Sequence, residues 1–278
     1  MFKLNKLSKI LILVFILLVF MGSLSLKKQY VAPIMMYHYF TYNANPNDKL
    51  NTKPDIFERQ MRFLRRHKYD IVPLEVLAEM IKQGSKIPRR TITVTMDDGY
   101  VNNYTYAFPI LKKYKIPATV FLIYDEVERP QNDRLSWAQI KEMQDSGLVT
   151  FGSHTLGPNP LINIKSDEEL KRQIFNSKKL LEDKLGRLVN TFSYPEGFFT
   201  DKIKQLVKDA GYKCAVATSP GSKFSSSDIF ALKRLMISSY SGDTFIFWVQ
   251  ISGYYTAMRE FQKRHKEAKR NQEARKIK

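Results

Sequence analysis

The stretch Thr93-Val94-Thr95-Met96-Asp97-Asp98-Gly99-Tyr100 places two adjacent carboxylates at the end of a β-branched run. Such a run favours a buried strand, and α/β folds carry their chemistry at the ends of strands. Successive strand side chains point to opposite sides, so Asp97 and Asp98 face different neighbours, and Gly99 permits a sharp turn. We expect one carboxylate to hold a metal and the other to handle a proton. A solvated turn after a core strand is the alternative.

Around this stretch, short apolar runs alternate with amphipathic segments, which is typical of a β/α fold with a largely parallel sheet. We expect strands at 31–37, 71–72, 92–96, 118–123, 148–152, 191–193 and 214–217. We expect helices at 56–67, 74–83, 106–114, 137–146, 167–185 and 201–210. Neither an internal repeat nor a linker divides this region, so a single domain is predicted.

The composition sets the class of protein. A chain of 278 residues with 44% hydrophobic residues can bury a sizeable core. Its net charge of +18 favours polyanions such as anionic lipid or an acidic cell-wall polymer. It carries no nucleic-acid recognition motif, so we expect no nucleic-acid partner. Its single cysteine, Cys214, excludes an intrachain disulfide and a multi-cysteine zinc site.

The two ends of the chain differ from this middle part. Lys3, Lys6 and Lys9 precede an uncharged run at 10–26, and Lys27-Lys28 closes it. This pattern predicts a signal or anchor segment at 1–28, with an uncleaved membrane anchor preferred, and a domain outside the cytoplasm. We assign 29–257 to the domain and 258–278 to a basic tail, which is expected to be solvated.

Two of the four histidines follow expected strands. His38 comes directly after the first strand, and His154 follows the strand at 148–152. His67 and His265 lie in basic, polar segments and are expected at the surface. In a barrel of parallel strands, His38 and His154 would converge with the Asp pair on one face.

At this point the motifs resemble those of the polysaccharide deacetylases, which are metal-dependent carbohydrate esterases of family 4 with a NodB-type domain. The resemblance covers about 31–247. Thr95-Met96-Asp97-Asp98-Gly99-Tyr100 resembles the first motif, in which the first Asp is the general base and the second is a metal ligand. Ser153-His154-Thr155 resembles the start of the second motif, whose histidine is a metal ligand. Met36-Tyr37-His38 is similar to the branch acting on poly-N-acetylglucosamine, where the early histidine is the general acid.

Two further segments extend the resemblance. Leu135-Ser136-Trp137 resembles the motif whose tryptophan supports the active-site wall, and Phe192-Ser193-Tyr194-Pro195-Glu196-Gly197 resembles the third motif. The resemblance therefore implies a single distorted (β/α) barrel of NodB type. It also implies substrate contacts from Trp137, Tyr194, Pro195 and Gly197, although core packing explains Trp137 equally well.

The implied reaction is removal of N-acetyl groups from an acetylated amino-sugar polysaccharide. It requires an activated water, a stabilised oxyanion and a proton for the leaving amine. The resemblance assigns Asp97 as base, His38 as acid, and Asp98 and His154 as ligands of a divalent metal. Zn²⁺ is the first choice, with Co²⁺ or Ni²⁺ as alternatives. A backbone N–H of the 194–197 loop is expected to face the oxyanion.

Two positions depart from the motifs. Where a second ligand histidine is expected, the sequence has Pro158, or Asn159 if the loop holds one extra residue. Asn159 is therefore only a weak candidate ligand, through its neutral carbonyl oxygen. Where the third motif carries Arg, the sequence has Ser193, and Arg234 is a candidate for the missing charge.

Three functions stay open on this basis. The preferred one is an extracytoplasmic, membrane-associated N-deacetylase. The others are a catalytically silent glycan-binding domain and an O-acetyl esterase. The presence of Asp97, Asp98, His154 and His38 together favours an enzyme, because a binding module needs none of their proton or metal chemistry.

Overall fold

The computed structural model describes residues 30–43, 48–129, 133–218 and 227–256, together with 258, 259, 262 and 266. These residues belong to two compact units, one spanning Ala32–Ser252 and the other drawn from the two ends of the chain. Within the second unit, the Val31 N–H donates to the Gly253 carbonyl at 2.8 Å. The expected anchor at 1–28 lies outside the described residues, and none of the described helices has the length and apolar character needed to cross a membrane.

The larger unit is built on a parallel sheet of nine strands in the order β8-β7-β6-β5-β4-β3-β1-β9, with β2 beside β3. The strands are β1 (Ile34–Tyr37), β2 (Asp70–Ile71), β3 (Thr91–Met96), β4 (Ala118–Leu122), β5 (Val149–Ser153), β6 (Thr191–Ser193), β7 (Cys214–Ala217), β8 (Leu232–Lys233) and β9 (Leu235–Met236). The two outermost strands, β8 and β9, are separated only by Arg234. One short segment, 232–236, therefore pairs with β7 and then with β1, and the sheet is nearly closed into a barrel. We call this segment the closing segment.

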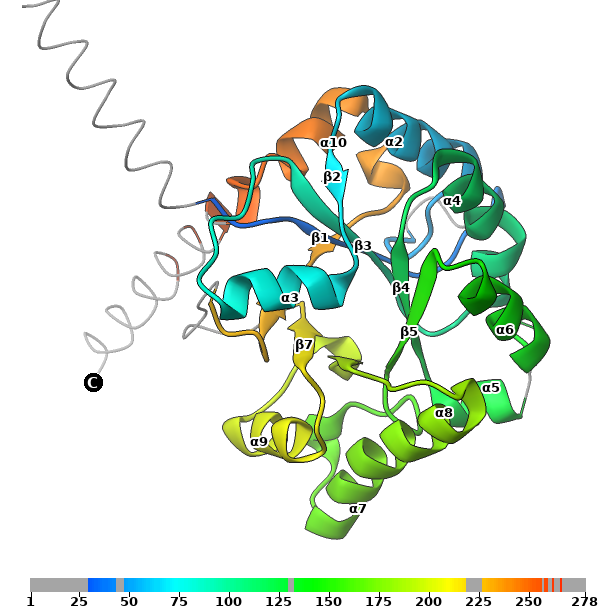
Figure 1. Cartoon of the computed structure of the whole chain (residues 1–278), viewed down its shortest axis with the longest axis vertical. Helices are drawn as coiled ribbons and strands as arrows, with labels where there is room; N and C mark the ends of the chain where they lie inside the picture. The colour runs from blue at the N-terminus through cyan, green and yellow to red at the C-terminus, as the bar shows by residue number, and fades with distance from the viewer. Residues whose placement is uncertain are drawn as a thin grey trace, which may run out of the picture. The chain divides into compact units, whose positions relative to one another are not determined.

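Helices lie outside the strands (Figure 1). They are α2 (Pro54–Arg66), α3 (Leu74–Lys82), α4 (Phe108–Tyr114), α5 (Tyr124–Glu128), α6 (Trp137–Asp145), α7 (Asp167–Lys171), α8 (Ser177–Leu185), α9 (Asp201–Asp209) and α10 (Thr244–Gln250). The helix expected at 167–185 is one helical run, in which a π-helical turn at Arg172–Asn176 joins α7 to α8.

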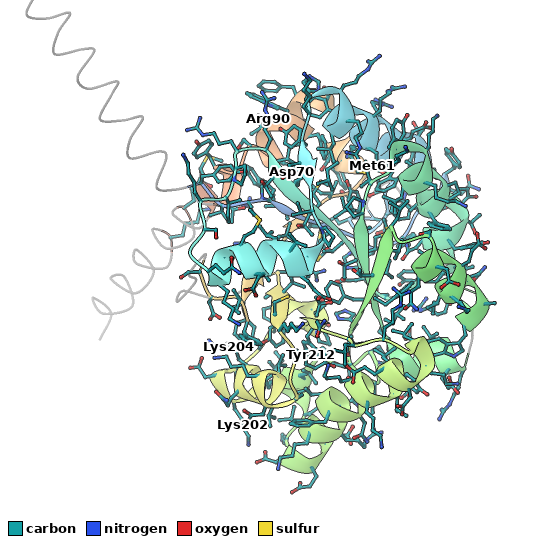
Figure 2. All side chains as sticks on the ribbon, in the orientation of Figure 1. Met61, Asp70, Arg90, Lys202, Lys204 and Tyr212 are labelled. Carbon is teal, nitrogen blue, oxygen red and sulfur yellow. The ribbon has the colours of Figure 1, made fainter. Side chains whose placement is uncertain are left out.

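The core follows from the apolar periodicity of these elements. On α2, Phe57, Met61 and Leu64 are buried at helical spacing, and Figure 2 marks Met61. Burying one such side chain contributes roughly 1.5–3 kcal/mol. Every residue of β3 is buried, as a central strand covered on both faces requires. This strand ends at Met96, directly before the Asp pair.

All the expected strands and helices are present, with ends shifted by a few residues. The sequence analysis missed α5, β8, β9 and α10. The first three are too short to show a period, and α10 presents Phe245, Ile246 and Trp248 outward, so its pattern does not mark a buried face.

Candidate active site

The two carboxylates leave β3 in different directions. Asp97 is buried and its N–H donates to the Tyr37 carbonyl at 3.0 Å, so β1 holds it in place. Asp98 has a φ of 69°, in the left-handed region that a residue with a side chain seldom adopts. Gly99 follows with a φ of 64°, and a Cβ there would lie 2.7 Å from Leu122 Cδ2. The chain turns away through strained backbone, which is a common feature of functional sites.

Asp97 is paired with a cation from the closing segment. Arg234 Nη1 and Nη2 donate to Asp97 Oδ1 and Oδ2, each at 2.6 Å, and both side chains are almost fully buried. Arg234 also donates to Ser193 Oγ at 2.9 Å. Burial acts to raise the pKa of the Asp97 carboxyl group, but the charge of Arg234, then that of His154, outweighs it and holds the pKa at about 2. Asp97 is therefore ionised whenever the protein is folded near neutral pH.

His154 follows β5 and presents one ring nitrogen to Asp98. Its Nδ1 lies 2.7 Å from the Ser193 carbonyl oxygen, which can only accept a hydrogen bond. Nδ1 therefore carries a proton, which leaves Nε2 as the ring nitrogen that can bind a metal. This Nε2 lies 3.5 Å from Asp98 Oδ1 and 3.9 Å from Asp97 Oδ2. Such an arrangement is typical of a histidine that is prepared as a metal ligand.

Hydrogen bonds to neighbouring residues hold the loop that carries His154 in place. Thr155 has a φ of 74°, and its hydroxyl donates to the Gly157 carbonyl at 2.6 Å. Ser153 Oγ bonds to Ser177 Oγ at 2.9 Å, and Ser177 Oγ lies 3.3 Å from the hydroxyl of Tyr212, which is labelled in Figure 2. The position of His154 is thus fixed by α8 and by the approach to β7.

His38 follows β1 and lines the same cavity as the Asp pair. Asn103 Nδ2 donates to its carbonyl at 2.8 Å, which fixes the backbone. Burial lowers the pKa of its imidazole, and the carboxylates of Asp97 and Asp98 oppose that shift. Among the described residues, Nδ1 of this ring is buried without a hydrogen-bond partner. Because Nδ1 is buried, proton exchange with the cavity falls to the other ring nitrogen, Nε2.

These groups meet in one cavity of about 350 Å³. It is lined by Met36, His38, Leu50, Asp97, Asp98, Tyr100, Ile123, Glu126, Arg134, His154, Pro158, Tyr194, Pro195, Glu196, Gly197, Thr218, Arg234 and Met236. Leu50, Glu126, Arg134 and Met236 belong to no motif, so the sequence analysis did not find them. The sequence analysis named Arg234, in Leu232-Lys233-Arg234-Leu235, only as a candidate for the missing charge.

The loop after β6 forms a wall of this cavity. Tyr194 is buried, with its hydroxyl donating to the Phe230 carbonyl at 3.0 Å. Gly197 has a φ of 74°, and a Cβ there would lie 2.4 Å from the backbone nitrogen of Thr218. The N–H groups of Tyr194 and Gly197 donate to protein carbonyls, and Pro195 has none. The N–H of Glu196, with a φ of 56°, therefore becomes the loop's candidate oxyanion donor.

Two expected site residues are not brought to the cavity. Trp137 lines a separate hollow of about 500 Å³ between α6 and α8, and its Nε1 donates to Glu128 at 2.9 Å. Trp137 does not line the cavity of the Asp pair, so its expected substrate contact stays a prediction. Asn159 is exposed and lies outside the lining of the cavity, whereas Pro158 is part of it. The structure therefore does not bring Asn159 to this cavity, and its role as a weak ligand stays a prediction.

The fold and these strand-end groups define a hydrolase of the carbohydrate esterase type. Residues 84–215 match the polysaccharide deacetylase family, and this range contains the Asp pair, His154 and the 194–197 loop. Over these residues the chain is similar to the polysaccharide deacetylases of carbohydrate esterase family 4, and the match supports a hydrolase of this kind.

Known proteins with similar sequences and structures agree with this assignment. The chain is 29% identical to a poly-β-1,6-N-acetyl-D-glucosamine N-deacetylase of Staphylococcus aureus over 213 residues, covering 72% of each protein. The structure of the Streptococcus pyogenes deacetylase PplD in complex with acetate superposes with a TM-score of 0.69 at 27% identity, over 75% of this chain and 93% of PplD. IcaB from Ammonifex degensii also superposes with a TM-score of 0.69, at 25% identity, over 80% of this chain and 97% of IcaB.

Members of the family are typically metal-dependent. Within the described residues, no three His, Cys, Asp or Glu side chains come together as a metal-binding group. Asp98 and His154 nevertheless fit a divalent cation, since the lone pair on His154 Nε2 and the carboxylate of Asp98 face each other at 3.5 Å. The donor set is one imidazole and one carboxylate, which leaves further positions for water.

Proposed function

We propose that this chain removes N-acetyl groups from N-acetylglucosamine-type residues of a cell-surface or extracellular polysaccharide. The observation that carries the proposal is the meeting of ion-paired Asp97, the Asp98–His154 pair and His38 in one cavity. The likeness to a Staphylococcus aureus poly-β-1,6-N-acetyl-D-glucosamine N-deacetylase supports the substrate class.

Asp97 acts as the base that removes a proton from the attacking water. Its bidentate pair with Arg234 fixes the carboxylate plane and keeps it ionised. A pKa of about 2 also makes it a weak base, so the water itself has to be acidified. A divalent cation held by Asp98 and His154 supplies that acidification and polarises the acetyl carbonyl when it is bound.

His38 gives a proton to the departing amine. Its ring lines the cavity, and because Nδ1 is buried, Nε2 is the nitrogen that delivers the proton. The Glu196 N–H donates to the developing oxyanion, and this interaction strengthens as negative charge forms. Leu50 and Met236 offer apolar contact to the faces of the sugar ring, whereas the ring of Tyr194 is buried behind the cavity wall.

We also propose that the domain works outside the cytoplasmic membrane and stays attached to it. The lysine-flanked uncharged run at 10–26 supports this location. Cell fractionation should find the protein with membranes, and protease added from outside the cytoplasmic membrane should degrade the domain. A protected, soluble protein in the cytoplasm would contradict this location.

The test of activity measures acetate released from an N-acetylglucosamine oligomer by the full chain, with the metal content of the same sample determined. We expect acetate release that stops on chelation. Release from an O-acetylated glycan alone would favour the O-acetyl esterase. Binding of the oligomer without any release would favour the silent glycan-binding domain.

A further inference from the structure

The cavity wall contains a second arginine that takes no part in the chemistry described above. Arg134 Nε donates to Glu126 Oε2 at 2.5 Å, and Nη1 donates to Asp133 Oδ2 at 2.6 Å. The side chains of Arg134 and Glu126 are only 12% and 18% exposed, and both line the catalytic cavity. The guanidinium carbon also lies 4.0 Å from the centre of the Tyr100 ring. This pair is largely desolvated, in contrast to the exposed ion pairs on the helices.

The segment that carries Arg134 is attached to the loop of the Asp pair. The Val101 N–H donates to the Asp133 carbonyl at 2.7 Å, and the Leu135 N–H donates to the Gly99 carbonyl at 2.9 Å. Tyr100 and Arg134 form an antiparallel bridge between these two bonds. Arg134 is therefore held in a fixed position relative to Asp97 and Asp98, as a substrate-positioning group must be.

A purely structural role explains this arrangement poorly. Desolvating an ion pair costs free energy that its Coulomb attraction does not fully return. None of the hydrogen bonds among the described residues uses Nη2 of Arg134, and this atom is not one of the buried atoms that lack a partner, so it is accessible to a ligand. This Nη2 of Arg134 and the second carboxylate oxygen of Glu126 belong to two side chains that both line the cavity.

We propose that Arg134 and Glu126 form a substrate-positioning pair that binds hydroxyl groups of a neutral amino-sugar ring beside the reacting acetamide. This inference rests on the proposed function. A hydroxyl group both donates and accepts, so it matches a guanidinium donor beside a carboxylate acceptor. Because Glu126 and Asp133 already balance the charge of Arg134, the pair selects neutral sugars over acidic ones.

The test compares two substrates on the full chain in detergent. One is an N-acetylglucosamine oligomer, and the other is p-nitrophenyl acetate, which needs the same cleavage machinery but has no sugar hydroxyls. Arg134→Met should lower the oligomer-to-ester ratio of kcat/KM by about 10- to 100-fold, mainly through KM, since a hydrogen bond to a charged group is lost. Arg134→Lys should recover part of this ratio.

Two further variants make the result interpretable. Arg172→Met removes an arginine that pairs with Glu169 at 2.7 Å on the exposed surface of the α7–α8 run, and it should leave both activities at wild-type level. Glu126→Gln keeps the side-chain shape, so it provides a folded variant if Arg134→Met does not fold. We expect it to lower the oligomer-to-ester ratio by about tenfold.

The outcomes separate the two proposals. If the wild-type chain releases no acetate from the oligomer, the proposed function fails and this inference fails with it. If the wild-type chain is active but Arg134→Met and Glu126→Gln leave the ratio unchanged, only the positioning pair is refuted. Faster turnover of an alternating glucuronic acid–N-acetylglucosamine oligomer than of the neutral oligomer would overturn the selection for neutral sugars.

Discussion

Two parts of the cavity depart from the family's motifs. One is the part around Asp97, proposed for proton transfer and called here the proton-transfer side. The other is the part around Asp98 and His154, proposed to hold a metal and called here the metal side. Only the first departure is compensated by another residue of the fold. On the proton-transfer side, Ser193 stands where the motif has Arg, and Arg234 from the closing segment reaches Asp97 in its place. On the metal side, Pro158, or Asn159 if the loop holds one extra residue, stands where the motif has a second histidine. Within the described residues, no three His, Cys, Asp or Glu side chains form a metal-binding group.

The difference follows from what each missing residue leaves behind. Without a cation, Asp97 would be a buried unpaired charge, and such a group destabilises a protein by several kcal/mol. A missing metal ligand leaves a position that water can fill, because catalytic metal sites keep open positions. A buried carboxylate therefore requires a replacement partner from elsewhere in the fold, whereas a metal site tolerates the loss at the expense of affinity.

The largest expected effect comes from removing the metal ion or its histidine ligand. Chelation should abolish acetate release quickly, because in the proposed site only Asp98 and His154 would hold the cation, and added Zn²⁺ or Co²⁺ should restore it. His154→Ala should nearly eliminate metal binding measured by isothermal titration. Tight binding that survives His154→Ala would show that the metal site lies elsewhere.

The next effect concerns the base. Asp97→Asn should lower kcat by roughly 10²–10⁴-fold, because the amide cannot accept the water's proton. The same range is expected for His38→Ala, which removes the proton donor. Steady-state acetate release measures both, with circular dichroism as a check of folding. The mechanism is wrong if either variant keeps wild-type turnover.

The third effect tests the replacement cation. Arg234→Met should lower the free energy of unfolding by about 3–5 kcal/mol at pH 7, since Asp97 loses its partner in a buried site. The folded-state pKa of Asp97, about 2 against an ordinary 3.8, is depressed, so its contribution is present above about pH 4 and is lost as the pH falls toward 2. The difference between variant and wild type should therefore shrink over that range.

Urea unfolding at pH 7, 4 and lower values measures this difference. The matched control is Arg172→Met, whose exposed ion pair with Glu169 should contribute only about 0–1 kcal/mol. Equal losses for Arg234→Met and Arg172→Met would mean that burial of the Asp97 pair has no energetic consequence.

The smallest expected effect comes from adding a second histidine as a metal ligand. Pro158→His places an imidazole on the cavity lining and should tighten metal binding on the order of tenfold. Asn159→His is the control, because that residue is exposed and outside the lining, and it should leave the affinity unchanged. Should Asn159→His tighten binding instead, the alignment of this loop with the motif would need to be moved by one residue.

Strand-end positions were predictable because the carboxyl ends of parallel strands meet at one edge of a sheet. Asp97, Asp98, His154 and His38 each follow a strand that the apolar pattern predicts, and the structure brings all four to one cavity. Their catalytic and metal-binding roles stay predictions.

Residues outside the strand ends were harder to place. Arg234 lies between two strands of only two residues each, too short to show a period, and it reaches Asp97 across 137 positions of sequence. Arg134 and Glu126 depend on a loop pairing that no local pattern encodes. Trp137 matched a motif, but the packing of α6 against α8 decided where its ring lies.

The closing segment also has a consequence for the order in which the protein assembles. Contacts between residues far apart in sequence form slowly, because loop closure has an entropic cost before they give any stabilisation. The last pairings of the sheet, β8 with β7 and β9 with β1, are the ones that deliver Arg234 to Asp97. Until the closing segment has paired with β7 and β1, the Asp97 carboxylate therefore lacks its Arg234 partner. We therefore expect Asp97 to gain its cationic partner only when the closing segment completes the barrel.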